Sequence, residues 1–178
     1  MIEPFTADKI REIDGHSAVS YGLSSHGYDL RLSEKEFLIF RHVPGTVIDP
    51  KRHNPDNMER AVLHEDKSGR YFILPGNSYG LGTTPDRLKM PGNVQGQATG
   101  KSTYARCGII VNITPVEAGW EGHLTLEFSN SSNADCRIYA DAGVCQIVFL
   151  AGEPPELCYV QRGTKYQDQP ERVVFGRA

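Results

Sequence analysis

The sequence lacks a long apolar run, a basic leader and an excess of positive charge. No stretch approaches the roughly 18 consecutive apolar residues of a membrane span, and the opening MIEPFTAD has no basic segment followed by an apolar one. The 19 Lys and Arg residues are outnumbered by 22 Asp and Glu residues, which gives a formal net charge of -3. Since no basic stripe interleaved with aromatic residues is present either, we expect a cytoplasmic protein that binds neither a membrane nor nucleic acid.

Cysteine is also scarce, and its spacing argues against a common type of metal site. The four cysteines, Cys107, Cys136, Cys145 and Cys158, form no Cys-x-x-Cys pair, so no zinc cluster is expected. Because free cysteine behaves as a small apolar side chain, we expect these thiols to be buried and inert.

What is present is a series of short β-like segments separated by Pro, Gly and Asn turns, which predicts a mainly all-β barrel or jelly roll. With 178 residues the chain suits one domain with a single core. One short helix is predicted near the start, with Thr6 as its cap, Ile10 and Ile13 on one face and Gly15 at its end. The candidate strands are residues 37–40, 71–74, 78–81, 109–113, 123–129, 137–139, 145–150 and 157–160.

Two segments are predicted to be irregular. Residues 51–69 are polar and are expected to form a long surface loop. The tail from about residue 166 has no apolar periodicity and is expected to be mobile. Since no linker composition interrupts the chain, we expect residues 1–178 to form a single domain.

The most informative stretch is residues 100–108, GKSTYARCG. Gly-Lys-Ser also occurs in the phosphate-binding loop of many NTPases, but that loop requires a glycine five residues before Gly100, where Gln95 stands, and a long helix after the hydroxyl residue. Here the β-branched run 109–113 follows almost at once and predicts a strand. The stretch is therefore predicted to be a compact turn that carries a lysine, two hydroxyls and an arginine between strands.

A second informative stretch, residues 123–130, alternates apolar and polar side chains in the order HLTLEFSN. In a strand, this order places Leu124, Leu126 and Phe128 on one face and Glu127 on the other. Two interpretations of the polar face are open, a solvated outer face or the wall of a pocket. On a pocket wall Glu127 would suit a general base, because the sheet fixes its position.

Together these stretches resemble the dCTP deaminase family. The resemblance implies a distorted β-barrel of the trimeric dUTPase kind, assembled as a homotrimer with sites near the subunit interfaces. The activity it implies is metal-independent hydrolytic deamination of dCTP to dUTP and ammonia, in the pyrimidine deoxynucleotide metabolism that supplies dUTP and dTTP precursors. The resemblance keeps the same order through most of the chain, at residues 20–31, 100–115, 119–130, 143–146 and 165–169.

The resemblance also implies roles for individual residues. Glu127 matches the catalytic carboxylate that moves protons from water to the cytosine ring, and Ser102 and Arg106 match residues that hold the water and the leaving amine. A backbone carbonyl at Pro115 would assist them. The positions that match substrate-binding residues are Lys101, Ser102, Thr103, Tyr104, Ala105, Arg106, Pro115, Glu117, Thr125, Leu126, Glu127, Gln146, Tyr159, Lys165 and Gln169.

The chemistry fits a site without a protein-bound metal. Deamination needs a water at C4 of cytosine, a proton on N3 and later a proton on the amine, and one carboxyl group can serve all three. Zinc deaminases use His-x-Glu with Pro-Cys-x-x-Cys, and none of the six histidines and four cysteines has this spacing. We therefore expect no zinc, and Mg²⁺ is expected to be carried by the substrate triphosphate.

Two other functions remain open from the residues. A dUTPase, or a bifunctional enzyme of the same fold, would cleave the triphosphate, and Glu117 is then the candidate to activate water near the α-phosphate. A non-catalytic nucleotide-sensing module is the third possibility, and the presence of Ser102, Arg106 and Glu127 together argues against it.

Several of these residues also have structural interpretations. Arg106 could be an ion-pair partner, and Lys101 could be a solvated loop charge. Trp120 is expected to be a wall or packing residue rather than a chemical one. Residues 94–99, VQGQAT, are more polar and richer in glycine than the apolar strand expected before the Gly-Lys-Ser turn.

Overall fold

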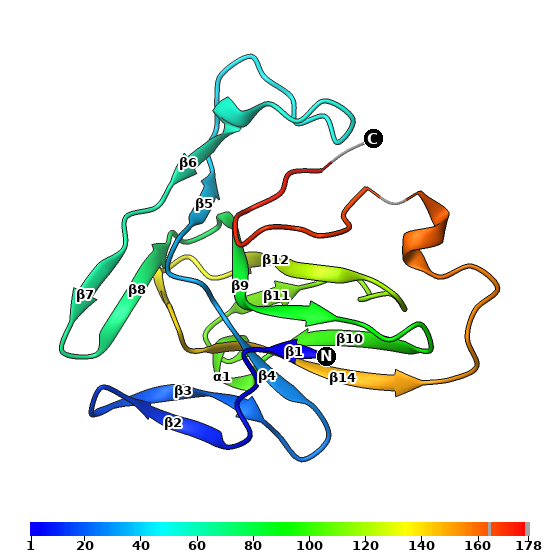
Figure 1. Cartoon of the computed structure of the whole chain (residues 1–178). Coiled ribbons are helices and arrows are strands. Elements are labelled where there is room, and N and C mark those ends of the chain that lie inside the picture. The colour runs from blue at the N-terminus through cyan, green and yellow to red at the C-terminus, as the bar shows by residue number, and fades with distance from the viewer. Residues whose placement is uncertain (164, 177–178) are drawn as a thin grey trace.

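The computed structural model describes residues 1–163 and 165–176, in which strands are the main regular structure (Figure 1). The mainly β prediction is confirmed, and none of the described helices is long and apolar enough to cross a membrane. The helical segments are η1 (Pro55–Asn57), α1 (Ser102–Ala105) and η2 (Tyr159–Arg162). The strands are β1 (Ile2–Glu3), β2 (Lys9–Ile13), β3 (His16–Leu23), β4 (Tyr28–Arg31), β5 (Phe37–Phe40), β6 (Met58–Arg60), β7 (His64–Asp66), β8 (Gly69–Leu74), β9 (Tyr79–Lys89), β10 (Val94–Gly100), β11 (Ile109–Asn112), β12 (Glu121–Asn130), β13 (Cys136–Tyr139) and β14 (Gly143–Ala151).

The described strands form three antiparallel sheets. The first has the order β11-β12-β9-β5-β6, and β1 also pairs with β9. The second has the order β10-β14-β4-β3-β2, and the third the order β13-β8-β7. Division into three sheets, rather than closure into one ring, fits the distorted form of the expected fold.

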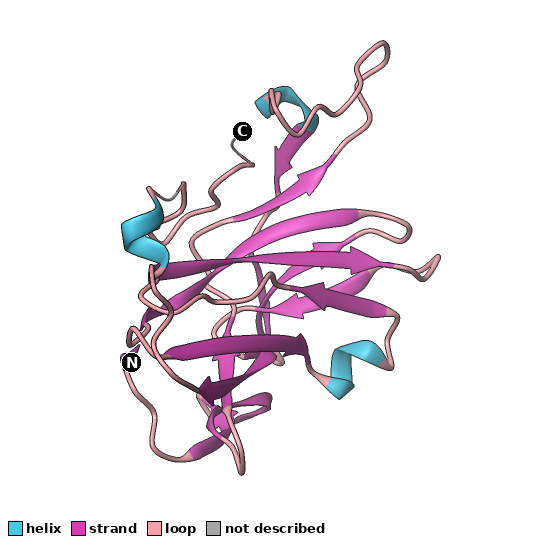
Figure 2. Ribbon diagram, turned by 90° about the vertical axis from the view of Figure 1, so that its right-hand side faces the viewer, coloured by secondary structure: helices cyan, strands magenta, loops and turns pink. Residues whose placement is uncertain are grey.

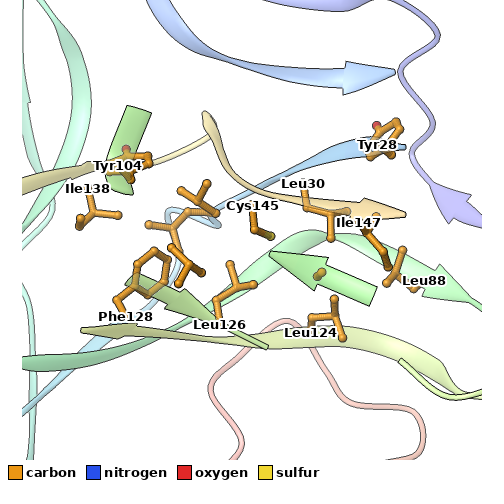
Figure 3. Packing of buried hydrophobic residues seen from close by; sticks show 14 of the residues in the cluster. Tyr28, Leu30, Leu88, Tyr104, Leu124, Leu126, Phe128, Ile138, Cys145 and Ile147 are labelled. Carbon is orange, nitrogen blue, oxygen red and sulfur yellow. The ribbon is translucent and has the colours of Figure 1, made fainter. Parts of the chain in front are cut away.

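The core lies between the first and second sheets. Figure 3 shows Leu124, Leu126 and Phe128 of β12 pointing toward side chains of β4 and β14, among them Leu30 and Ile147. All five side chains are buried. The intervening residues of β12 are half-exposed, so the alternation predicted from the sequence is confirmed.

The helix predicted near Thr6 is wrong, because β2 and β3 form a β-hairpin there. Asp14 and Gly15 both have positive φ, 49° and 79°, which is the backbone of the two-residue turn that suits the twist of a hairpin. A helix of so few residues would be marginal in water, whereas the hairpin extends the second sheet.

Two further predictions are corrected. Residues 157–160 do not form a strand, because Tyr159–Arg162 is the 3₁₀ helix η2. The N-terminus of η2 is capped by a hydrogen bond from the backbone N–H of Cys158 to Gln161 Oε1. Residues 51–69 are not one long loop, because they contain η1, β6 and β7.

The polar residues 94–99 form a full strand, β10, which pairs with β14. Gly96 explains how a glycine-rich segment packs there. A Cβ atom at Gly96 would lie 2.6 Å from the Ile147 side chain, so the missing side chain lets the strand approach the core closely.

The cysteines differ from one another in burial. Cys145 lies in the core, and burial raises the pKa of its thiol to about 12, so it is inert as expected. The expectation of burial is wrong for Cys107, which is exposed in the turn after α1, and Cys136 and Cys158 are half-buried.

The C-terminal residues 165–176 lie against the first sheet. The backbone N–H of His123 donates to the carbonyl of Gln169 at 3.0 Å, and a parallel bridge joins Gly122 to Gln169. Gly122 has φ +143°, and a Cβ atom there would lie 2.6 Å from the Gln169 nitrogen, so this contact requires glycine. The mobility of the tail stays a prediction, and its last residues, 177 and 178, lie outside the described residues.

Truncation of Phe128 tests the packing of β12. Its ring is 0% exposed and lies 5.3 Å from the ring of Phe37, so Phe128→Ala leaves a cavity between the sheets. We expect the free energy of unfolding in urea to fall by about 3–5 kcal/mol. Val47 is 89% exposed, and Val47→Ala as a control should change it by less than about 0.5 kcal/mol. Equal effects of the two variants would contradict this packing.

Candidate functional site

A pocket of about 360 Å³ lies over the polar face of β12. Its walls come from β12, from the residues that join β11 to β12, from η2 and from the C-terminal tail. Trp120, which is buried, forms part of the wall, as predicted. The predicted site residues that line the pocket are Pro115, Glu117, Thr125, Glu127, Tyr159 and Gln169.

Glu127 is fixed on the pocket wall by side chains of both neighbouring strands. Its Oε2 accepts a hydrogen bond from Nδ2 of Asn112 on β11 and one of 3.5 Å from the hydroxyl of Tyr79 on β9. Burial raises the pKa of Tyr79 to about 12, and the negative charge of Glu127 contributes to this, so the hydroxyl keeps its proton and donates. A carboxylate held in this way can direct its second oxygen, Oε1, at a ligand.

Sequence reasoning missed Asn112 and Tyr79. The available signal was strand pairing, since residues 109–113 and 123–129 were both predicted to be strands close in sequence. In the antiparallel ladder Asn112 lies directly opposite Glu127, and Tyr79 lies opposite Ser129. Side chains at such opposite and diagonal positions are neighbours on one face, but the register was needed to identify them.

Two hydrogen bonds join residues that line the pocket to the tail. The hydroxyl of Thr125 donates to Gln169 Oε1 at 3.2 Å, and Nε1 of Trp120 donates to the carbonyl of Tyr166 at 2.8 Å. These bonds connect β12 and the adjacent loop to the segment that covers them. Lys165 lies on the same segment and is exposed.

The Gly-Lys-Ser turn lies elsewhere within the chain. The predicted turn is one helical turn, α1, and Figure 1 and Figure 2 both place it well away from η2, which lines the pocket. Arg106 Nη1 donates to the carbonyl of Ser102 at 3.2 Å. The exposed residues of the turn are Ser102, Thr103, Ala105, Arg106 and Cys107, none of which lines the pocket of its own chain.

Lys101 anchors this turn to the second sheet. Its ammonium donates to Asp29 Oδ2, to the carbonyl of Ser20 at 2.7 Å and to the hydroxyl of Ser20 at 3.1 Å. Asp29 is 1% exposed, and its other oxygen accepts a 2.9 Å bond from Gln146 Nε2. Lys101 is therefore not a solvated loop charge, and the side chains of Lys101 and Gln146 are both engaged with one buried carboxylate.

Two predicted binding residues have buried side chains. Tyr104 is 4% exposed, and its hydroxyl accepts a 2.9 Å bond from the backbone N–H of Tyr139. Leu126 is 0% exposed and packs in the core. At these two positions only backbone atoms are placed to meet a ligand.

Within residues 1–163 and 165–176, no group of three or more His, Cys, Asp and Glu side chains is arranged to hold a metal ion.

Comparison with known proteins gives one consistent relationship. The family model described as dCTP deaminase-like matches residues 1–152. The dCTP deaminase of Acidithiobacillus ferrooxidans is 46% identical over 170 residues, which cover 95% of this chain and 87% of that protein. The dCTP deaminase of Stenotrophomonas maltophilia is 45% identical over 172 residues, with the same shares covered.

Solved structures support the fold. A 2'-deoxycytidine 5'-triphosphate deaminase from Agrobacterium tumefaciens superposes with a TM-score of 0.53 at 17% identity, over 73% of this chain and 40% of that one. The dUTPase of Staphylococcus bacteriophage 80alpha superposes with a TM-score of 0.51 at 12% identity, over 88% of this chain and 85% of that one. The predicted dUTPase-type fold is thereby confirmed.

Removal of the Lys101 charge tests the anchor of the turn. In Lys101→Met the buried carboxylate of Asp29 loses its main cation, and Lys9 remains 3.7 Å away. We expect a loss of about 3 kcal/mol in the free energy of unfolding, the lower end for breaking a buried pair. Lys35 pairs with Glu171 while 63% exposed, so Lys35→Met should cost at most about 1 kcal/mol. If Lys101→Met lowered the free energy of unfolding by no more than Lys35→Met does, Asp29 would need no buried cation.

Proposed function

The chain belongs to the dCTP deaminase-like family, and we propose that it catalyses the hydrolytic deamination of dCTP to dUTP and ammonia. The observation that carries the proposal is the position of Glu127, mid-strand on the wall of a nucleotide-sized pocket, with its Oε2 fixed by Asn112 and Tyr79. The curated relatives of nearly the same length are named dCTP deaminase. The proposed cellular role is the supply of dUTP for pyrimidine deoxynucleotide metabolism in the cytoplasm.

In the proposed reaction Glu127 moves every proton. Its free oxygen takes a proton from the water that attacks C4 of cytosine and delivers it to N3 of the ring. The tetrahedral intermediate then loses ammonia, after Glu127 has passed the second proton of the water to the amine. Asn112 and Tyr79 keep the carboxylate in one orientation through these steps, so that Oε1 alone changes protonation.

The remaining catalytic groups are proposed to come from another subunit of a homotrimer. Ser102 begins α1 and Arg106 follows its last residue; both are exposed and do not line the pocket of their own chain. Beside them, β11 is the edge strand of the first sheet and carries Ile110 with 57% exposure, a surface that a neighbouring subunit would cover. In such an assembly Ser102 and Arg106 would orient the water and the leaving amine at the Glu127 of the adjacent chain.

The nucleotide is proposed to be enclosed by the residues that line the pocket. The Pro115 carbonyl and the backbone at Thr125 and Leu126 would meet the base, and Glu117 would lie near the sugar. The turn from Lys101 to Arg106, with Gln146 behind it, would contribute to the triphosphate site, and Mg²⁺ would arrive on the phosphates. The remaining predicted residues would close the site, Tyr159 from η2 and Lys165 and Gln169 from the tail.

One observation favours a second activity, cleavage of dUTP to dUMP and pyrophosphate. The carboxylate of Glu117 lines the same pocket as Glu127 and could activate a second water. This bifunctional alternative is separated from simple deamination by its products.

Incubation with dCTP and Mg²⁺ followed by chromatography of the nucleotides tests the function. We expect dUTP and ammonia, and we expect Glu127→Gln to bind dCTP while its turnover falls at least about 100-fold, because the amide cannot carry protons. Glu65→Gln, on β7 outside the pocket, is the matched control and should keep full turnover.

Undiminished turnover in Glu127→Gln would remove Glu127 from the reaction. dUMP and pyrophosphate would establish the bifunctional enzyme, and no conversion would favour a sensing module.

Mixing two inactive variants tests the shared site. Glu127→Gln and Arg106→Ala are each expected to be nearly inactive, and refolding them together in equal amounts should restore about one quarter of the wild-type activity, because random trimers then contain sites with both wild-type residues. Refolding Glu127→Gln with Glu127→Ala is the control and should restore nothing. No recovery in the first mixture would show that each site belongs to one chain.

A further inference from the structure

The end of the tail is fastened to a loop that lies outside the pocket. Val174 and Gly176 line the pocket beside Trp120, and between them Phe175 stacks on His53, with ring centroids 4.2 Å apart and planes inclined by 17°. His53 belongs to the segment between β5 and η1. Figure 1 shows the red C-terminal segment running toward this segment. The contact therefore joins the cover of the pocket to a separate part of the fold.

His53 is held in an environment that suits a neutral ring. The ring of Phe40 also packs against it edge to face, with centroids 6.3 Å apart and planes inclined by 89°. Its Nε2 is buried and has no hydrogen-bond partner among the described residues. Burial lowers the pKa of His53 below its ordinary value of 6.5.

The charged groups near His53 are Glu36, which is hydrogen-bonded to the tail, and Glu171 and Arg172, which lie on the tail. Glu36 and Arg172 line the same cavity as His53. Glu36 Oε2 accepts a 2.7 Å bond from the backbone N–H of Val173. Burial would raise the pKa of Glu171, but bonds from Lys35 and Ser33 lower it overall, so Glu171 keeps its charge as pH falls toward 5. His53 is the anchor of the tail whose neutral ring gains a positive charge once pH falls below its ordinary pKa of 6.5, and burial delays that gain.

We propose that neutral His53 is a positioning residue that holds the C-terminal tail over the nucleotide pocket through Phe175, and that protonation of His53 releases the tail. The effect of this protonation on catalysis rests on the proposed function, whereas its effect on the position of the tail does not. The proposal adds a pH-sensitive latch to the site, with His53 and Phe175 as its two halves.

The physical basis is the cost of a buried N–H without an acceptor. The imidazolium ring would carry a second N–H at Nε2, where no acceptor among the described residues faces it, and a buried donor without a partner is unfavourable, more so when it is charged. In the released state, water solvates that donor. The docked state thus has the lower pKa, so docking is favoured fully above about pH 6.5 and is lost as pH falls through the docked pKa.

Trp120 reports the latch without any substrate. It is the single tryptophan, it lines the pocket beside Val174 and Gly176, and its Nε1 bonds to the tail at Tyr166. We expect the fluorescence of the full chain to move to longer wavelengths as pH falls below about 6.5, in a single titration. His53→Phe keeps the stacked ring and cannot be protonated, so its fluorescence should not titrate.

Two further variants separate the latch from general effects. Phe175→Leu removes the ring that stacks on His53 and should give the long-wavelength emission at every pH, with an unchanged far-ultraviolet circular dichroism spectrum. His26→Phe alters an exposed histidine outside the latch and should titrate like the wild type. A wild-type emission that does not titrate, or a titration that persists in His53→Phe, would overturn the proposal.

The kinetic consequence is confined to substrate binding. In the wild type, KM for dCTP should rise by up to about tenfold per pH unit as pH falls from about 6.5 toward the lower docked pKa of His53, because one proton opposes docking. His53→Phe should keep the KM measured at pH 7.5 down to pH 5.5, with a kcat profile that matches the wild type. A loss in kcat alone would show that the latch does not act on binding. An absence of turnover with an intact fluorescence titration would refute the proposed function and leave the latch standing.

Discussion

The pairing of β12 with β9 on one side and β11 on the other is the constraint from which the site follows. Buried side chains on one face of β12 pack against the second sheet, and this packing fixes the strand along its length. The opposite face then presents Glu127 at a set depth, and the neighbouring strands supply Asn112 and Tyr79 at matching positions. A single strand therefore connects the stability of the core to the geometry of the carboxylate, because the two faces cannot shift independently.

The second sheet contributes a different constraint, a buried ion pair. Lys101 stands where a phosphate-binding lysine would be expected, yet its ammonium is engaged with Asp29 and Ser20. Its charge neutralises a carboxylate that would otherwise be buried alone. The consequence is a rigid base for α1, which leaves the exposed Ser102 and Arg106 as the groups of this turn that can reach a partner or a ligand.

The relation between sequence and structure differs from element to element. The strands around Leu126 and Ile110 were predictable, because alternation and β-branched runs are local signals. The hairpin at Asp14 and Gly15 was mistaken for a helix, since two isoleucines three residues apart share one face of a helix. In the structure the register of β2 shifts between Ile10 and Glu12, and Ile10 and Ile13 are both half-buried. Asp-Gly between two strand-like runs was the signal that distinguishes the two structures. Of the predicted site residues, those near Trp120 converge on one pocket and those on α1 do not.

The sequence by itself determined the β class, the buried and polar faces of β12, the proposal of Glu127 as the base and the resemblance to the dCTP deaminase family, because these depend on residue type and on spacing within short segments. Tertiary structure alone decided that Asn112 and Tyr79 hold Glu127, that Lys101 is committed to Asp29, and that Phe175 stacks on His53. Each of these contacts joins residues whose proximity is set by strand register and chain path. The physical reason is that local propensity specifies the elements, whereas the partner of a polar side chain is fixed only when the packed core has placed those elements against one another.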